Sequence, residues 1–354
     1  MVIVGGGPAG ALAALKLAHT AARVLVIDRP RPDRVEVAEI MSPEGREILD
    51  REKVWSQIPL DLTRPCPSMA AAWDGPDPVW TSFTLSPSGC AWHIDRVRLD
   101  AWMLRRLQTT GVAVEAGTVN GVARRDDDGW QITFTSNDTQ QVTSSRFLML
   151  ATGRSSQTIR LAPRRAIDNL CLVAGTTEPD PVDPDALIVE ATSDGWWYSA
   201  PLISGRLFTG WMTDFSLVAR GRYTEAAATS ITGAPLHARR IGAPHLGTII
   251  GAATWAMSPA AGPGWIAIGD AALGRDPIGG DGLTSALRSA CHGAEVVQQA
   301  LDGDASVWAS AADRTSQIAA RYEAQRRDLY RIALKRWPTS TFWRRFAIGA
   351  DTGA

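Results

Sequence analysis

The chain has 354 residues, of which 45% are hydrophobic and 21% charged, and its formal net charge is −1. This composition predicts about two domains with large cores. It excludes a disordered chain and argues against nucleic acid as the main partner. No run of about 18 apolar residues occurs, so no membrane span is expected. The four cysteines are widely spaced, so we expect reduced thiols in a cytoplasmic protein, with no signal peptide, disulfide framework or metal site.

The first third of the sequence predicts a βαβ unit and further mixed elements. A short apolar run at 1–4, a glycine-rich turn, a helix at 11–19 and a strand at 23–27 follow one another. Further helices are predicted at 44–57 and 95–109, and strands at 112–115, 130–134 and 147–150. The stretch 62–92 is rich in Pro, Ser, Gly and Trp, which indicates loops and short strands.

Between residues 166 and 256 the pattern changes to short alternating runs, which indicate a mostly antiparallel sheet at 170–175, 186–192, 196–202, 206–212 and 247–257. A buried strand at 265–268 and helices at 282–301 and after 305 follow. We therefore expect an α/β protein in which a nucleotide-binding domain, built from both ends of the chain, is interrupted by an inserted, mostly antiparallel β-sheet substrate domain. The expected boundaries are 1–62, 93–165 and 257–302 for the nucleotide-binding domain, 63–92 and 166–256 for the substrate domain, and 303–354 for a C-terminal helical tail.

A glycine-rich turn lies between the first predicted strand and helix. In Gly5-x-Gly7-x-x-Gly10, the first glycine permits a tight turn, the second lets a pyrophosphate approach the backbone, and the third packs helix on strand. Asp28 ends the second strand, where a carboxylate binds ribose hydroxyls. This combination predicts a dinucleotide but does not separate FAD from NAD. The predicted residues here are Gly5, Gly7, Ala9, Gly10, Asp28 and Arg29.

A second motif separates the two cofactors. Gly269-Asp270-Ala271-Ala272 follows the strand at 265–268, and Pro277 and Gly280-Asp281-Gly282 then open a helix. The order resembles flavin monooxygenases with the p-hydroxybenzoate hydroxylase fold. The resemblance implies an FAD-binding, Rossmann-like domain of the glutathione reductase type. The resemblance implies that Asp270 binds a ribityl hydroxyl of FAD. It also implies that the loop with Pro277, Gly280, Gly282 and Leu283 lies against the flavin, where a helix N-terminus stabilises negative charge on reduced flavin.

Two further segments match the same family. Arg96-x-x-Leu99-Asp100 resembles a helix whose arginine reaches FAD, and the alternative is a solvated helix arginine. Ala151-Thr152-Gly153 resembles the segment that closes the FAD site, so Thr152 and Gly153 are predicted to bind FAD. The hydroxylases often have an Asp in this region, which serves FAD and NADPH. Its absence here puts direct use of NADPH in doubt, so electrons are expected from NAD(P)H or from a separate flavin reductase.

Other segments narrow the resemblance. Residues 38–43, AEIMSP, and 196–201, WWYSAP, resemble segments of flavin halogenases. Halogenases also need a lysine near the pocket and a glutamate in the flavin loop. Neither is found here, because the three lysines are Lys16, Lys53 and Lys335 and the glutamate position holds Gly279. With residues 336–345, the pattern is more similar to the halogenase-related monooxygenases that mature quinone-cofactor amine oxidases by hydroxylating a tryptophan of a partner protein.

The resemblance implies an FAD-dependent monooxygenase that hydroxylates an indole- or phenol-like substrate through a flavin C4a-hydroperoxide. The substrate is an aromatic small molecule or a tryptophan in a partner protein or peptide. We name Pro277, Asp281 and Trp196 as candidate catalytic residues. The alternatives are a flavin reductase or dehydrogenase of the same fold, a flavin halogenase, which the missing groups disfavour, and a non-catalytic FAD-binding chaperone.

Several residues admit two interpretations. Asp281 either caps the helix that starts at Gly282 or acts as a base toward substrate. His93 and His292 are isolated histidines, and His292 is expected to be structural. The tryptophans at 73, 80, 92, 196, 197 and 211 are either core or the lining of an aromatic pocket. Residues 314–346 hold nine Lys or Arg, which form either a solvated helix face or a dock for an acidic partner.

Overall fold

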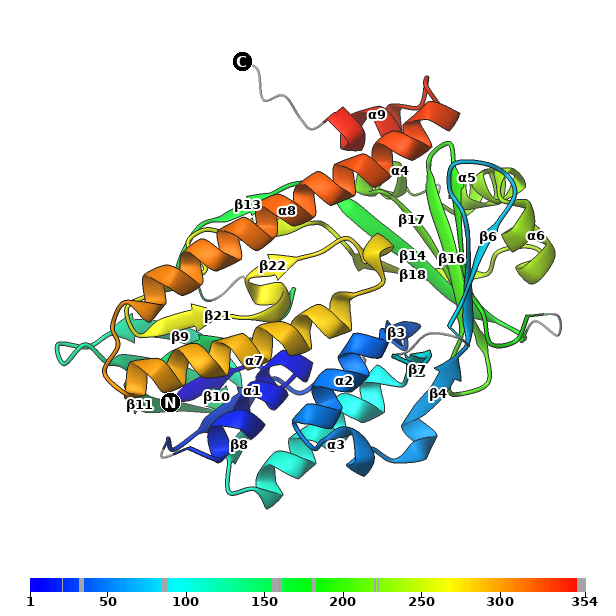
Figure 1. The fold of residues 1–354 in the computed structure, drawn as a ribbon. Coiled ribbons are helices and arrows are strands. Elements are labelled where there is room, and N and C mark those ends of the chain that lie inside the picture. The colour runs from blue at the N-terminus through cyan, green and yellow to red at the C-terminus, as the bar shows by residue number, and fades with distance from the viewer. Residues whose placement is uncertain are drawn as a thin grey trace, which may run out of the picture.

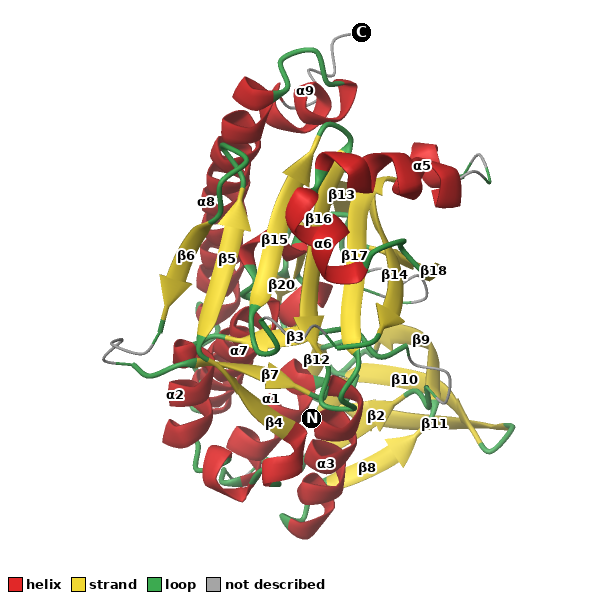
Figure 2. Ribbon diagram, turned by 90° about the vertical axis from the view of Figure 1, so that its right-hand side faces the viewer, coloured by secondary structure: helices red, strands yellow, loops and turns green. Residues whose placement is uncertain are grey.

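The chain folds around two large β-sheets that a long C-terminal helix connects (Figures 1 and 2). The structure is a computed structural model. It describes residues 1–20, 22–31, 35–83, 88–154, 159, 161–179, 183–219, 221 and 223–348, the last without its side chain. In this part of the chain, no helix combines the length and the apolar character that crossing a bilayer requires.

The first sheet has six strands in the order β20-β21-β12-β1-β2-β8, all parallel except β20. Val4 of β1 lies opposite Ile27 of β2 and Leu150 of β12. The carboxyl ends of the parallel strands therefore share one edge, where ligands bind in open α/β sheets. The strands are β1 (Val2–Val4), β2 (Leu25–Asp28), β8 (Ala113–Ala116), β12 (Leu148–Leu150), β20 (Ala261–Gly262) and β21 (Trp265–Ala267).

Four helices pack on or beside this sheet, and α1 contacts both α3 and α7. Pro8 starts α1, which is favourable because proline has no backbone N–H to leave unpaired in the first turn. Ser42 caps α2 and Asp95 caps α3, each accepting a hydrogen bond from a backbone N–H three residues later. The four are α1 (Pro8–Ala18), α2 (Pro43–Arg51), α3 (Arg96–Thr109) and α7 (Gly282–Leu301).

The second sheet has seven strands in the order β18-β14-β17-β16-β15-β5-β6, antiparallel except for the pair β15–β5. Every residue of β16 and β17 is buried, because both faces of the sheet are covered. One face packs against three short helices (Figure 2). The strands are β5 (Ser68–Ala72), β6 (Val79–Ser82), β14 (Leu170–Thr177), β15 (Leu187–Thr192), β16 (Gly195–Pro201), β17 (Leu207–Asp214) and β18 (Leu246–Gly251). The helices are α4 (Phe215–Val218), α5 (Tyr223–Ser230) and α6 (Pro235–Ile241).

Three small sheets and several single turns complete the fold. The small sheets are β3-β7-β4, β11-β10-β9 and β13-β19-β22. Their strands are β3 (Glu39–Met41), β4 (Thr63–Cys66), β7 (Ala91–Ile94), β9 (Thr118–Arg124), β10 (Trp130–Ser136), β11 (Thr139–Ser145), β13 (Arg164–Ala166), β19 (Trp255–Met257) and β22 (Leu273–Gly274). The 3-10 turns are η1 (Trp55–Gln57), η2 (Leu60–Leu62), η3 (Ile231–Gly233), η4 (Gly269–Ala271) and η5 (Pro277–Gly279).

The C-terminal helices α8 (Val307–Arg336) and α9 (Thr341–Ile348) run from the six-stranded sheet to the seven-stranded sheet (Figure 1). The basic residues of this region do not form one solvated face. Arg326 is only 4% exposed, and Arg345 pairs with Asp214. Arg336 donates to the Gly75 carbonyl at 2.8 Å. Part of the positive charge therefore attaches the tail to the rest of the chain, and docking of an acidic partner stays a hypothesis.

The sequence-based expectation of an α/β fold with an inserted, mostly antiparallel sheet is confirmed. Several details were wrong. The strands β9 and β11 were not predicted, and the helix expected at 44–57 ends at Arg51. The run predicted as one strand at 247–257 forms two strands, β18 and β19, which belong to different sheets. The helices α4, α5 and α6 were not predicted, because each is short and their packing on the seven-stranded sheet, rather than a long apolar period, stabilises them.

Candidate functional site

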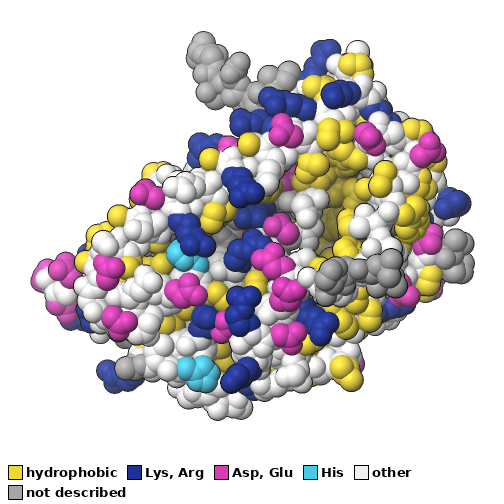
Figure 3. Space-filling model, viewed as in Figure 1, with side chains coloured by type: hydrophobic (Ala, Val, Ile, Leu, Met, Phe, Trp, Pro, Cys, Tyr) yellow, Lys and Arg dark blue, Asp and Glu magenta, His cyan; other side chains and the backbone are white. Residues whose placement is uncertain are grey.

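A cavity of about 660 Å³ lies between the six-stranded sheet and the seven-stranded sheet. Figure 3 shows a hollow on this face whose walls are mainly hydrophobic. One end of the cavity is lined by the glycine-rich turn, the N-terminus of α3, the turn η4 and the segments 275–280 and 282–283. The opposite end is lined by side chains of the seven-stranded sheet. We call these the motif end and the sheet end.

The glycine-rich turn at the motif end leaves one glycine facing the cavity. A Cβ on Gly10 would lie 1.9 Å from the Gly5 carbonyl oxygen, and a Cβ on Gly5, where φ is +107°, would lie 2.3 Å from the Ala151 carbonyl oxygen. A Cβ on Gly7 would meet no atom within 4 Å, and Gly7 lines the cavity. Gly5 and Gly10 therefore permit close packing, whereas Gly7 leaves space for a ligand beside the N-terminus of α1.

Asp28 lies at the carboxyl end of β2 beside this turn. Its Oδ1 accepts a hydrogen bond from the Gly6 N–H at 2.8 Å and pairs with Arg31 at 2.9 Å. Asp28 borders a cavity of about 70 Å³, and Arg29 and Thr152 line both this cavity and the large one. Asp28 does not line the large cavity, so its role in binding ribose hydroxyls stays a prediction.

Arg96, the first residue of α3, lies in the wall of the cavity between two carboxylates. Its Nη1 is 3.0 Å from Glu39, and its Nε is 3.1 Å from Asp100. Burial lowers the pKa of Arg96, but Asp100 and Glu39 outweigh burial and raise the pKa above its ordinary value. The guanidinium therefore stays charged, with its charge balanced by two carboxylates, and the predicted contact of Arg96 with FAD stays a prediction. The solvated-arginine alternative is wrong.

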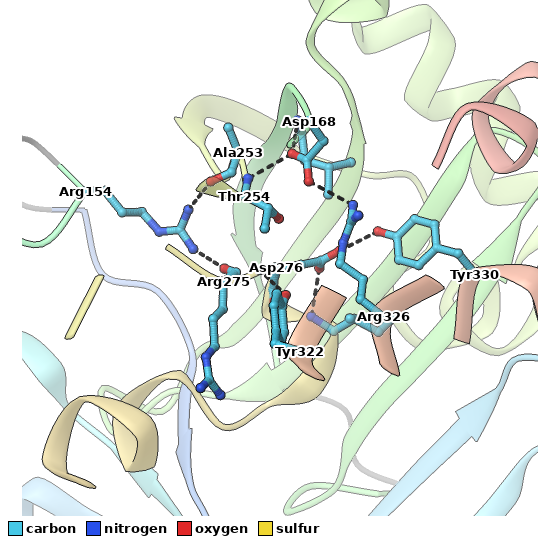
Figure 4. Close-up of polar contacts among 11 residues, drawn as sticks. Arg154, Asp168, Ala253, Thr254, Arg275, Asp276, Tyr322, Arg326 and Tyr330 are labelled. Atoms are coloured by element: carbon cyan, nitrogen blue, oxygen red, sulfur yellow. Dashed lines mark hydrogen bonds and ion pairs between the residues drawn. The ribbon is translucent and has the colours of Figure 1, made fainter. Parts of the chain in front are cut away.

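Asp270 lies in η4 and lines the cavity with a third of its side chain exposed. Arg154 pairs with it at 3.2 Å. Arg154 also donates to the Ala253 and Arg275 carbonyls (Figure 4). Thr152 and Gly153 line the same wall, and the buried Thr152 Oγ1 has no hydrogen-bond partner among the described residues. A ribityl chain would supply such a partner. The open cradle at Gly7, the carboxylates and this orphaned hydroxyl together fit FAD.

The loop between η4 and α7 approaches the cavity through its backbone. Pro277, Gly279, Gly280 and Gly282 line the cavity together with Leu283. Gly280 has a φ of +59°, a left-handed conformation that favours glycine. The loop ends where α7 begins, so backbone N–H groups of the helix N-terminus lie at the cavity wall.

Asp281 in this loop does not have the role that was first expected. Its side chain makes no capping hydrogen bond to α7. Its Oδ2 pairs with Arg275 at 2.8 Å and accepts a hydrogen bond from Ser285 at 2.9 Å. Asp281 therefore occupies the N-cap position of α7, but its side chain does not cap the helix. Asp281 is also not among the residues that line the cavity, so its position lends no support to a role as base.

The sheet end of the cavity is apolar. Burial, together with Glu39, raises the pKa of Tyr198 above its ordinary value, so its hydroxyl stays protonated. Trp196 is 1% exposed and packs beside Tyr198, with their ring centroids 5.8 Å apart. The described side chains that form this end are Met69, Leu172, Leu187, Val189, Trp196, Tyr198 and Ile250.

Of the other tryptophans, Trp197 and Trp211 are core residues, whereas Trp73 and Trp92 are half-buried and Trp80 is 47% exposed, so the core interpretation holds only in part. Trp197 and Trp211 stack with centroids 6.0 Å apart on the opposite face of the seven-stranded sheet. Trp73, Trp80 and Trp92 do not line the cavity either. Alternation along β16 explains the division, because neighbouring residues of a strand point to opposite faces. Tyr198 was missed, although this alternation from Trp196 could have identified it.

The two isolated histidines are structural. His93 bonds the Asp185 carbonyl at 2.9 Å through Nε2, and burial lowers its pKa to about 4. Burial also lowers the pKa of His292, which does not line the cavity.

Sequence reasoning also missed the contacts of Arg154 and Glu39. Both residues belong to segments that matched the family, which is a signal that could have identified them.

The comparisons with known proteins agree with this geometry. Residues 1–170 match the family described as FAD binding domain. The chain is 25% identical to the "Putative FAD-dependent oxidoreductase LodB" of Marinomonas mediterranea over 363 residues, which cover 97% of this chain and 95% of the relative.

Two solved structures are similar over nearly the whole chain. The peptidyl tryptophan dihydroxylase QhpG, essential for tryptophylquinone cofactor biogenesis, superposes with a TM-score of 0.80 and 25% identity, covering 100% of this chain and 79% of that one. The flavin-dependent halogenase CmlS has a TM-score of 0.87 and 23% identity, covering 97% of this chain and 66% of that one. The chain is therefore an FAD-dependent oxidoreductase with an N-terminal FAD binding domain and the fold that flavin halogenases and hydroxylases share.

Proposed function

We propose that this enzyme is a monooxygenase that hydroxylates an aromatic ring, and that the ring is a tryptophan side chain of a partner peptide or protein. The observation that carries the proposal is the cavity itself. It joins residues that fit FAD directly to a wall of apolar and aromatic side chains. A flat, electron-rich ring fits such a wall, and binding there buries its apolar surface.

When bound, FAD supplies the activation of O₂ that such a hydroxylation needs. The residues of the chain contribute binding, orientation and exclusion of water. Trp196, Tyr198 and Leu172 form an apolar wall, which disfavours water around the reacting groups. The charge of Arg96 is balanced by Glu39 and Asp100. No acid–base pair of fixed spacing is required, because the cofactor performs the difficult step.

A protein-bound tryptophan is favoured over a free aromatic compound by the similarity to QhpG, which extends over the whole of this chain. Halogenation is disfavoured by the cavity wall. None of the three lysines lines the cavity, and Lys16 pairs with Glu52 at 2.6 Å. Gly279 occupies the position of the halogenase glutamate, so no carboxylate is present there.

The test measures the product directly. Holoenzyme reduced chemically is mixed with isotopically heavy O₂ and, separately, indole, phenol, free tryptophan or a peptide with one central tryptophan. We expect the tryptophan peptide to gain the mass of one or two heavy oxygen atoms, located on the indole by fragmentation. If phenol or indole alone is hydroxylated, the monooxygenase proposal holds and the peptide assignment fails. Hydrogen peroxide as the sole product with every compound would overturn both.

We also propose that a separate reductase or chemical donor supplies the electrons. The segment Ala151-Thr152-Gly153 lacks the Asp that relatives use, and the sequence contains no second GxGxxG. Stopped-flow bleaching of the flavin band by NADPH should therefore be about a hundredfold slower than a typical enzyme turnover of roughly 10 s⁻¹. Bleaching at that turnover rate, with or without an aromatic substrate, would show a self-sufficient hydroxylase.

A further inference from the structure

A buried polar network attaches α8 to the loop that the sequence motif assigns to the flavin (Figure 4). Its centre is Asp276, which immediately precedes Pro277 and is 2% exposed. Oδ2 of Asp276 accepts hydrogen bonds from Arg326 Nε at 2.9 Å and from the Tyr330 hydroxyl at 2.5 Å. Oδ1 accepts a hydrogen bond from the Ile278 N–H at 2.9 Å. Both carboxylate oxygens are therefore bound, one by α8 and one by the loop.

The backbone of the same residue is held by α8 as well. The Tyr322 hydroxyl accepts a hydrogen bond from the Asp276 N–H at 2.7 Å. Tyr322, Arg326 and Tyr330 are spaced by four residues, so they share one face of the helix. All three are buried, whereas Arg327 and Arg331 on the same helix are exposed. One face of α8 therefore contacts Asp276, the residue at the start of the loop.

Arg326 also reaches the other half of the molecule. Its Nη2 pairs with Asp168 at 2.8 Å, and Asp168 is fully buried. Asp168 in turn accepts hydrogen bonds from the Leu170 N–H at 3.0 Å and the Thr254 N–H at 2.9 Å. Leu170 begins β14, so Asp168 lies where the chain enters the seven-stranded sheet. One guanidinium therefore connects the loop at the motif end to the start of β14, a strand of the sheet end.

Such a network is costly to bury, which indicates a role beyond stability. Desolvating an arginine and two carboxylates offsets much of their mutual attraction, and well-packed apolar side chains often stabilise a core equally well. Directed hydrogen bonds do differ from apolar contacts in one respect, since they fix the position of the groups that they join. The group fixed here is the loop Pro277–Gly280, which lines the cavity.

We propose that Tyr322, Arg326 and Tyr330 of α8 are positioning residues, which through Asp276 set the placement of the loop Pro277–Gly280 toward the flavin. The inference rests on FAD binding alone and is independent of the proposed substrate. It implies that the C-terminal helix, which lies outside the matched FAD binding domain at 1–170, helps to set the chemistry of the cofactor.

Tyr330→Phe is the most informative variant, because it deletes one hydroxyl and keeps the ring in the core. Tyr223→Phe is the matched control, since Tyr223 lies in α5 on the far face of the seven-stranded sheet. The dissociation constants of oxidised and reduced FAD, the reduction potential of the bound flavin and the melting of the apoprotein are measured for each. We expect Tyr330→Phe to weaken FAD binding roughly three- to tenfold, consistent with a lost charge-assisted hydrogen bond, and to shift the potential.

The potential separates positioning from stability. It depends on the ratio of the two dissociation constants. A displaced loop alters the environment of the reduced flavin, where charge accumulates, more than that of the oxidised flavin. A purely structural loss weakens both forms equally and leaves the potential unchanged. An unchanged potential in Tyr330→Phe, with or without weaker FAD binding, would overturn the inference.

Substitution of the arginine provides a second, stronger test. Arg326→Met leaves Asp168 and Asp276 without their cation, and we expect it to shift the potential further than Tyr330→Phe does. Arg326→Lys should recover part of that shift, because it keeps the charge but cannot bridge both carboxylates. Arg327→Met, on the exposed side of the same helix, should change neither the potential nor FAD affinity. If Arg326→Met does not fold, Tyr330→Phe alone decides the question.

Discussion

The two ends of the cavity are built by different means. At the motif end, backbone groups and charged side chains from turns and a helix N-terminus line the cavity, as Gly7, Arg96 and Asp270 illustrate. At the sheet end, apolar side chains of regular strands do so, as with Leu172 and Ile250. A cofactor with fixed phosphates and hydroxyls requires fixed polar partners. An aromatic substrate requires mainly shape and exclusion of water, which many apolar combinations provide.

The two ends of the cavity also differ in charge. Charged groups at the motif end are already paired in the protein, Arg96 with Glu39 and Asp100, and Asp270 with Arg154. The motif end therefore binds FAD with groups whose positions are set beforehand, which lowers the entropic cost of binding. If the two ends are independent, substitutions at one end should leave the function of the other intact.

The largest effect is expected from Gly10→Ala. Its Cβ would lie 1.9 Å from the Gly5 carbonyl oxygen, so the strand–helix turn must shift. We expect the purified variant to contain no FAD and the apoprotein to melt at a lower temperature, since overpacking of this kind costs roughly 1–3 kcal/mol. Flavin absorbance and thermal melting of the apoprotein measure the two effects.

Gly7→Ala is the matched control, because the same methyl group meets no protein atom within 4 Å. It should leave the apoprotein as stable as the wild type but weaken FAD binding, since the methyl projects toward the ligand. Equal loss of stability in both variants would contradict the division between a packing glycine and a ligand-facing glycine.

Asp270→Ala should have the next largest effect. It removes the carboxylate that lines the cavity and leaves Arg154 without its ion pair. We expect FAD affinity to fall about ten- to hundredfold, which corresponds to roughly 1.5–3 kcal/mol for a hydrogen bond to a charged group. Equilibrium titration of the apoprotein with FAD measures it. Asp138→Asn, an exposed change in a distant turn, is the control, and full flavin retention in Asp270→Ala would refute the motif assignment.

A smaller and more selective effect is expected at the sheet end. Ile250 lines the cavity, whereas its neighbour Ile249 is 42% exposed on the other face of β18. Ile250→Trp should reduce kcat/KM for the aromatic substrate about tenfold by filling the cavity, while FAD affinity stays unchanged. Ile249→Trp should change neither. Loss of FAD from Ile250→Trp would show that the two ends are not independent.

The same division explains what the sequence could predict. The residues at Gly5, Gly7, Gly10 and Asp270 were predicted because each belongs to a short motif whose spacing is set by a local turn. The fold class followed from the change in hydrophobic period near residue 166. The pairing of Arg96 with Glu39 and the network around Asp276 were not predicted, because they join residues far apart in the sequence. No local pattern distinguishes Arg326 from the exposed arginines beside it on α8.

The last expectation is that adding halide has no effect on the products. CmlS, with a TM-score of 0.87, shows that a halogenase shares this fold, so the fold alone does not exclude halogenation. By its resemblance to halogenases, this chain would need a lysine beside the pocket to halogenate a substrate. Here all three lysines lie outside the cavity wall, and Lys16 is engaged by Glu52. Reduced holoenzyme, O₂ and bromide or chloride should therefore give no halogenated tryptophan or phenol by mass spectrometry. A halide-dependent product would show that groups other than lysine direct hypohalous acid at the sheet end. The sheet end would then contribute to the chemistry and not only to the shape of the substrate site.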